Sequence, residues 1–226
     1  MTLPDGPWLN IGSGPSNPEP WINIDASWQA RLAGRRWLAA VVRRVTGRDV
    51  GHWPNGLRHR DIRRGLGFAD NAVAAVYASH VIEHLYRDEA VAFLREARRV
   101  LKPGGVCRIV APDAQAIVSW YLSHRAEGPH PDTSSSDLLM DLLMLRPRTA
   151  PGRAGPLRWL LHADGLNAHK WMYDADGLTA VMHEAGFAGA EAKNYLDSAI
   201  PRDGLERVEA PDRVCNGAGV CVEARK

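Results

Sequence analysis

Leu9-Asn10-Ile11-Gly12-Ser13-Gly14 is a short apolar run that ends in a glycine-rich turn. A run of this length that is bounded by glycine and proline is typical of a buried strand. Trp21–Asp25, with the sequence WINID, is a second run of this kind, and only a polar, proline-rich segment separates the two. The segment is too short for the usual crossover helix, so we expect a bare loop between two neighbouring parallel strands.

Strand-like and helix-like segments alternate along the rest of the chain. Apolar residues at helical spacing, together with caps and breakers, predict helices at 28–45, 88–101, 137–145 and between Asp174 and Gly186. Short apolar runs predict further strands at 58–62, 73–79, 106–111, 190–196 and 220–224. Such alternation indicates one α/β domain over residues 1–226, with a mainly parallel sheet covered by helices on both faces.

Composition is that of an ordinary globular protein, with 45% hydrophobic and 24% charged residues in 226. A chain of this length buries enough surface to fold without a disulfide or a structural metal. The three cysteines form no disulfide framework or zinc spacing, and we expect Cys107 to be a small buried apolar residue. No apolar run approaches the ~20 residues of a membrane span. We therefore expect a cytoplasmic location and no signal peptide, since the first residues show no basic head followed by an apolar core.

The glycine-rich turn and Asp25 predict a site for an adenosine-containing cofactor. Glycines there allow a ligand to approach the backbone, and a carboxylate at the end of the second strand can accept both ribose hydroxyls. A dinucleotide fits poorly, because Asn17 interrupts the G-x-G-x-x-G pattern and no helix follows to face a pyrophosphate. S-adenosylmethionine has no phosphate, so it does not need that helix.

Five segments together resemble the class I S-adenosylmethionine-dependent methyltransferases, in particular small bacterial members. They are LNIGSG, WINIDAS, HRDI, FADNAVAAVYASHVIEHL and LKPGGVCRIVAPD, within residues 8–113, and weaker likeness follows at 169–187 and 219–225. The resemblance implies a Rossmann-like, doubly wound sheet of seven strands whose last strand is antiparallel. The chain departs from the family in lacking the helix after the glycine-rich loop and an N-terminal cap.

The resemblance also assigns cofactor contacts. Gly12 and Gly14 would approach the amino-acid end, Asp25 the ribose, Asp61 with Ile62 the adenine, and Ser79 with His80 the methionine portion. The full set implied is Asn10, Gly12, Ser13, Gly14, Asp25, Asp61, Ile62, Ser79 and His80. Asp61 could instead cap a helix, and Ser79 could simply end a strand.

His80-Val81-Ile82-Glu83-His84 permits three interpretations. If the stretch is helical, His80, Glu83 and His84 share a face and could chelate a divalent metal. Alternatively Glu83 and His84 brace the turn, or a histidine acts without metal as a base, since its pKa lies near neutrality. The order H-x-x-E-H is also that of the inverted zinc proteases, but the surrounding motifs do not belong to that class.

His169 precedes the predicted helix at Asp174 and either faces the substrate or packs beside the cap. A base is needed only if the methyl acceptor is a hydroxyl, and we rank the candidates His84, His80 and His169 in that order. We expect O-methylation of a small molecule, a sugar or natural product. The alternatives are an N- or RNA methyltransferase and a protein that binds the cofactor without transferring its methyl group.

The insertion at 114–172 is expected to form a lid or an acceptor-binding region, with Leu138, Leu139, Leu142 and Leu143 in a mobile cover over the acceptor. The alternative for this apolar segment is a helix of the core. Ten arginines lie between Arg31 and Arg64, where Asp49 and Asp61 are the only acids. This stretch could attract an anionic partner, but a solvated helix face explains it as well, and no stacked-aromatic motif accompanies it. We therefore expect no nucleic-acid partner, and a monomer or a homodimer.

Overall fold

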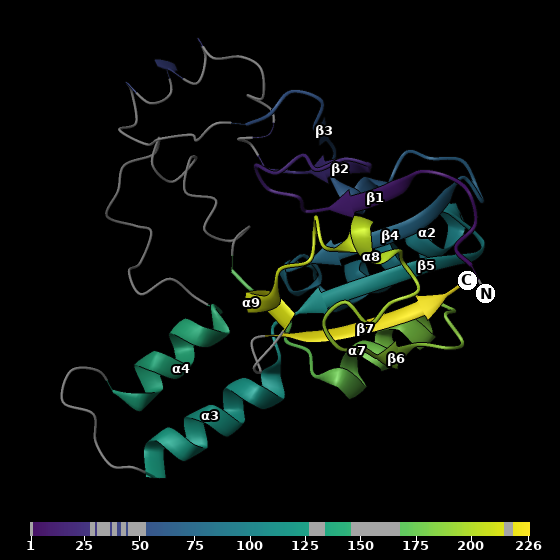
Figure 1. The fold of residues 1–226 in the computed structure, drawn as a ribbon. Coiled ribbons are helices and arrows are strands. Elements are labelled where there is room, and N and C mark those ends of the chain that lie inside the picture. The colour runs from purple at the N-terminus through teal and green to yellow at the C-terminus, as the bar shows by residue number, and fades with distance from the viewer. Residues whose placement is uncertain are drawn as a thin grey trace.

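The computed structural model describes residues 2–27, 53–126, 134–145, 168–214 and 219–226, with Ala30, Trp37, Ala40, Val41 and Arg44. Its centre is a seven-stranded sheet in the order β3-β2-β1-β4-β5-β7-β6 (Figure 1). The strands are β1 Trp8–Ile11, β2 Trp21–Asp25, β3 Arg58–His59, β4 Val73–Ser79, β5 Leu101–Ala111, β6 Glu191–Ala192 and β7 Val220–Arg225. β7 runs antiparallel to both of its neighbours, and the other pairs are parallel. The expected seven-stranded sheet with an antiparallel last strand is confirmed.

The longer helices begin and end where the sequence places caps and breakers. They are α2 Arg87–Val100, α3 Ala114–Ala126, α4 Ser135–Leu143 and α7 Ala175–Glu184. At α2, the Glu89 carboxylate accepts a hydrogen bond of 2.9 Å from the backbone N–H of Tyr86. At α7, Asp174 accepts from the N–H of Gly177 at 2.8 Å, and the chain leaves the helix at Gly186 with φ 99°. Both predicted helices are therefore confirmed.

The first face of the sheet is covered as the apolar pattern predicts. Leu9, Ile11 and Ile24 point to this face and pack with the buried stripes of α2 and α7. The stripe of α2 includes Ala90, Leu94 and Ala97, all inaccessible to solvent. Burial of this kind stabilises the fold by roughly 25 cal/mol for each Å² of apolar surface removed from water.

The second face is also covered by helices, but these are short and belong to one irregular segment. Trp8, Trp21 and Tyr77 line it, and the segment 194–214 crosses it with two four-residue helices, α8 Arg202–Leu205 and α9 Pro211–Val214. The indole N–H of Trp21 donates to the carbonyl of Gly204 at 2.8 Å. A β-carbon at Gly204 would lie 2.1 Å from the Trp8 ring, so only glycine lets that ring lie against the backbone.

A buried arginine, Arg108, links the segment 194–214 to the sheet. The Arg108 guanidinium, in β5, donates to both carboxylate oxygens of Glu209 at 2.7 and 2.9 Å and lies 3.2 Å from Glu223. It also donates to the carbonyls of Asn194 and Asp197. The guanidinium therefore links β5 to β7 and to the segment 194–209, which lie far apart along the chain.

Other segments differ from prediction in length. β3 and β6 have two residues each, shorter than the strands expected at 58–62 and 190–196, whereas β5 starts five residues earlier than expected. Of the helix expected at 28–45, the described Trp37, Ala40, Val41 and Arg44 are helical, and most of the remainder lies outside the described residues. The sequence also predicts loops at 126–136 and 146–156, and residues 127–133 of the first and all of the second lie outside the described residues.

The bare loop after β1 is confirmed, because β1 and β2 pair in parallel with no helix between them. α3, which the sequence reading did not predict, leaves the carboxyl end of β5 and packs beside α4, so that the two extend away from the sheet (Figure 1). Within the described ranges, no helix combines the length and apolar character that a membrane crossing requires.

Candidate active site

The ends of four parallel strands form one edge where a ligand can bind. Ile11 of β1 pairs with Ile24 of β2 and Ala78 of β4, and Ala78 pairs with Ile109 of β5. The residues that follow therefore lie along the carboxyl edge, among them Gly12, Asp25 and Ser79. Strand order reverses between β1 and β4, and open α/β sheets bind ligands at this switch point.

The glycine-rich turn closes onto Asp25. Gly12 and Gly14 have φ 70° and 59°, in the left-handed region that favours glycine. The backbone N–H of Gly14 donates to Asp25 Oδ2 at 2.9 Å, and that of Ser27 donates to Oδ1 at 2.7 Å. Each carboxylate oxygen can accept a second hydrogen bond, so Asp25 can still receive two ribose hydroxyls.

The remaining expected cofactor residues have other partners in the structure. Asn10 is buried and donates its side-chain amide to Asn23 at 2.8 Å, which couples β1 to β2. Asp61 caps the short helix η2 Ile62–Arg64 and forms two hydrogen bonds of 2.9 Å with Arg63, which hold the pKa of Asp61 below its usual value.

The other expected cofactor residues differ in whether they keep an unused polar group. Ile62 is buried, and Ser13 donates its hydroxyl to the carbonyl of Gly14. Ser79 ends β4, and its hydroxyl is buried without a hydrogen bond among the described residues. Ser79 therefore offers an unused polar group at the carboxyl edge, beside the glycine-rich turn.

A cluster of histidines follows β4. His80 has φ 53°, in the left-handed region, and lies outside any helix. The helix that follows is the three-residue η3 Ile82–His84. The single helical face expected for His80, Glu83 and His84 is therefore not formed, because a left-handed residue precedes the helix. Glu83 is inaccessible to solvent, and its Oε1 lies 3.4 Å from His80 Nδ1.

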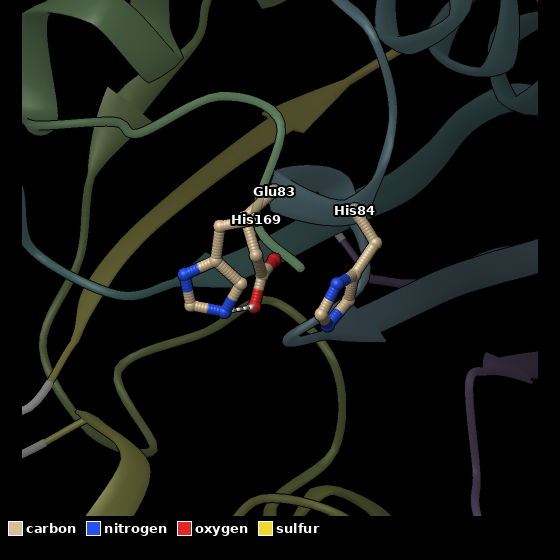
Figure 2. Close-up of side chains that lie close together, drawn as sticks. All are labelled: Glu83, His84 and His169. Atoms are coloured by element: carbon tan, nitrogen blue, oxygen red, sulfur yellow. Dashed lines mark ion pairs between the residues drawn. The ribbon is translucent and has the colours of Figure 1, made fainter. Parts of the chain in front are cut away.

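The structure adds His169 to this cluster. His169 Nε2 lies 4.0 Å from Glu83 Oε1, and the rings of His169 and His84 are 5.0 Å apart (Figure 2). The backbone fixes this approach, since Lys170 and Trp171 donate their N–H groups to the carbonyl of Glu83 at 2.7 and 3.2 Å. The Lys170 ammonium also donates to the carbonyl of His84 at 3.0 Å. Sequence spacing cannot predict this meeting, because 86 residues separate Glu83 from His169.

Burial decides the protonation of two groups here. It lowers the pKa of His169, although the Glu83 carboxylate opposes the shift, so the His169 imidazole is neutral at neutral pH. Burial also raises the pKa of Tyr173 to about 12, so its phenol stays protonated and is a poor base. The cluster therefore offers neutral imidazole nitrogen as a proton acceptor or a metal ligand.

Comparison with known proteins identifies a matching domain family and solved structures of similar fold. Residues 10–109 match the methyltransferase domain family. A SAM-dependent methyltransferase from Archaeoglobus fulgidus superposes with a TM-score of 0.50 at 14% identity, covering 98% of this chain and 86% of the other. A SAM-dependent methyltransferase from Thermotoga maritima, described as a possible histamine N-methyltransferase, gives 0.49 at 16% identity, covering 99% and 84%. No curated protein sequence matches the chain significantly.

Residues 10–109, a little under half of the chain, match this family, and the fold is shared over nearly the whole chain. The matched segment contains the second half of β1, the strands β2 to β4, most of β5 and the glycine-rich turn. It includes His80, Glu83 and His84 of the histidine cluster, whereas His169 lies beyond it.

Proposed function

We propose that the protein transfers the methyl group of S-adenosylmethionine to a hydroxyl of a small molecule, a sugar or a natural product. The supporting observation is the cluster of His80, Glu83, His84 and His169 that follows the carboxyl end of β4. A hydroxyl must lose its proton when it accepts a methyl group, and imidazole can take that proton at neutral pH.

In this reaction the acceptor oxygen attacks the methyl carbon in line with the sulfonium. A carbon–oxygen bond forms, the carbon–sulfur bond breaks, and neutral S-adenosylhomocysteine leaves. The proton passes to a histidine of the cluster, with His84 first, then His80 and His169, and from there to water. Because the methyl group is already activated, alignment of the reactants supplies much of the rate, roughly 7–11 kcal/mol in well-oriented pairs.

The cofactor half of the site would use Gly12, Gly14, Asp25 and Ser79 as the sequence resemblance implies. The side chains of Asn10 and Asp61 bind Asn23 and Arg63. These two residues would therefore contribute to cofactor binding by fixing the backbone around the site. We place the acceptor between the histidine cluster and the insertion at 114–172.

The test is an assay of S-adenosylhomocysteine release on three acceptor classes: small hydroxyl compounds, amines and RNA. We expect turnover on a hydroxyl compound, with mass spectrometry locating the new methyl on oxygen. Turnover confined to amines or RNA would contradict O-methylation, and cofactor binding without turnover on any class would favour a non-catalytic protein. Calorimetry with NAD serves as the specificity control and should show no binding.

A further inference from the structure

Glu83, His84 and His169 form a tight group of metal-ligating side chains. One donor atom from each lies within 4.8 Å of the other two, and Figure 2 shows the carboxylate between the two imidazoles. Two ligands come from η3 and the third from the segment that precedes α7. The backbone hydrogen bonds from Lys170 and Trp171 to Glu83 hold the two segments together.

The carboxylate of Glu83 lacks the partners that burial requires. Both of its oxygens are shielded from solvent and accept no hydrogen bond within the described part of the chain. Its ion-pair neighbours there are the imidazoles of His80 and His169, at 3.4 and 4.0 Å, with no lysine or arginine. Burying a carboxylate with no cation or hydrogen-bond donor beside it costs several kcal/mol of folding free energy. A cation bound at this position would offset that cost.

His169 is the third member of the group. Its Nε2 faces Glu83, and the backbone of Leu143 hydrogen-bonds the ring. His84 Nδ1 lies 3.5 Å from the carbonyl of Ala168. A carbonyl only accepts, so a proton on Nδ1 leaves the lone pair of His84 on Nε2, the arrangement that outer-shell carbonyls impose on metal-binding histidines.

We propose that Glu83, His84 and His169 bind one divalent transition-metal ion of the Zn²⁺ or Co²⁺ type. Metal–ligand bonds of about 2.0–2.2 Å put tetrahedral ligand atoms about 3.4 Å apart. The three side chains therefore need to close by an ångström or so, which side-chain rotation supplies. Three protein ligands leave a coordination position for water or for an oxygen of a bound molecule.

The donor set determines which metal fits. Two imidazoles and one carboxylate suit zinc, cobalt and iron, whereas Mg²⁺ and Ca²⁺ prefer oxygen ligands alone. His80 is not a member of the group that meets the 4.8 Å limit, which differs from the set His80, Glu83 and His84 expected from helical spacing.

The test measures metal binding without any methyl transfer, so its result is independent of the proposed function. The full-length protein, freed of metal by a chelator, is titrated calorimetrically with Zn²⁺ and with Mg²⁺. We expect one Zn²⁺ per chain and at least a tenfold weaker response to Mg²⁺. Co²⁺ should give visible d–d absorption that Zn²⁺ displaces.

Three variants locate the site: Glu83→Gln, His84→Ala and His169→Ala. Each should weaken Zn²⁺ binding at least tenfold, while His183→Ala, on the exposed surface of α7, should leave it unchanged. Glu83→Gln is isosteric and removes an unpaired buried charge, so it should fold at least as well as the parent and lose the rise in Tm that Zn²⁺ causes. Absence of stoichiometric Zn²⁺ binding, or equal affinity in all three variants, overturns the proposal.

Discussion

At the residue scale, Asp25 both shapes the cofactor turn and remains able to bind the cofactor. Its two oxygens accept backbone N–H groups from Gly14 and Ser27, one on each side of the carboxylate. This arrangement holds the carboxylate in a fixed orientation before any ligand binds. Prior orientation reduces the ordering cost of binding, so the ribose hydroxyls would meet acceptors that are already positioned.

We predict that Asp25→Ala weakens S-adenosylmethionine binding by about 1.5–3 kcal/mol, a rise in Kd of roughly 10- to 150-fold. The reason is the loss of charge-assisted bonds to the ribose. Calorimetry measures the Kd, and Asp176→Ala, in the exposed first turn of α7, is the matched control. Asp25→Asn keeps one acceptor oxygen for the N–H groups of the turn but removes the charge. Comparing the two variants therefore shows whether a disordered turn or the lost charge weakens binding. An unchanged Kd in Asp25→Ala would show that the ribose binds elsewhere.

The histidine cluster carries the second prediction at this scale. His84→Ala should lower kcat on the true acceptor about 10²–10⁴-fold, because general-base assistance typically contributes that much. Cofactor affinity should barely change, since the missing interaction belongs to the transition state. Near-normal turnover in His84→Ala, His80→Ala and His169→Ala alike would mean that catalysis here is alignment alone.

Metal content distinguishes a base from a ligand in the same samples. If His84→Ala loses turnover together with bound metal, and chelator treatment of the parent enzyme has the same effect, His84 acts as a ligand. If turnover falls while metal content is unchanged, His84 acts on the acceptor proton. His183→Ala controls for general effects of removing an imidazole.

At the element scale, α4 is a surface helix despite its apolar sequence. None of its residues is buried, and Met140 and Leu142 are about two-fifths exposed. It packs on α3, which itself exposes Val118 and Leu122. A core helix, the alternative to a mobile cover, would bury this stripe, so the pattern favours the cover.

We therefore predict that α4 becomes protected when cofactor and acceptor bind together. Hydrogen exchange at 135–143 should slow in the ternary complex, because a closing cover buries its apolar side chains. Exchange in α2 serves as the internal control and should not change. Identical exchange of α4 in the free and the fully bound protein would argue against a cover.

The pair of Glu96 and Arg99 ties α2 to the segment before β4. Glu96 accepts two hydrogen bonds from Arg99 at 2.7 and 2.8 Å and one from the backbone N–H of Leu66 at 2.9 Å. Arg99 hydrogen-bonds the carbonyl of Phe68 and pairs with Asp70. The hydrogen bonds from Arg99 are the largest cause that holds the pKa of Glu96 below its usual value.

This pKa shift predicts a loss of stability in acid. Because the folded-state pKa lies below the unfolded value of about 4.3, the contribution is present above that pH and is lost as the pH falls through the folded value. Glu96→Gln should lower the free energy of unfolding near pH 7 by about 1–2 kcal/mol. In urea titrations at a series of pH values, the difference between the two proteins should shrink toward acid. A difference independent of pH would exclude the carboxylate as its cause.

Sequence reasoning succeeds for those elements whose signals are local. α7 has its cap Asp174, its stripe and its terminal Gly186 within thirteen residues, and β4 is one apolar run. α3 was missed because its apolar residues follow no single face, although Asp113 caps it by accepting hydrogen bonds from the backbone N–H groups of Gln115 and Ala116. β6 was overestimated because the chain leaves the sheet edge soon after Ala192, and the carbonyl of Asn194 already binds Arg108 on the second face, a contact that local pattern does not record.

At the scale of the whole molecule, the first face of the sheet was predictable and the second was not. Periodic helices cover the first, whereas segment 194–214 reaches its place through Trp21, Trp8 and Arg108, whose partners are about 90–200 residues distant in sequence. One local signal existed: Arg108 interrupts an apolar strand and therefore needs a buried anion. The same limit applies to the site, where Glu83 and His84 were found together but His169 joined them only through tertiary structure.

Arg108 is the residue on which the second face depends, and it carries the last prediction. Its guanidinium and the Glu209 carboxylate are inaccessible to solvent, and Glu223 is nearly so. Removing one partner of a buried charge network leaves the others uncompensated, so Arg108→Ala should lower the free energy of unfolding by about 3–5 kcal/mol. Urea denaturation measures the loss, and tryptophan fluorescence should report it, since Trp8 and Trp21 lie under segment 194–214.

The matched variant removes the charges together. Arg108→Met combined with Glu209→Gln and Glu223→Gln leaves no buried charge in the network, while each glutamine can still accept the backbone N–H that its glutamate now receives, from Leu196 and Ala199. Most of the stability lost in Arg108→Ala should return, because the penalty comes from unpaired carboxylates and not from the loss of a strong attraction. If the triple variant is as unstable as Arg108→Ala, the arginine's hydrogen bonds to the carbonyls of Asn194 and Asp197 hold the segment, and the carboxylates are secondary.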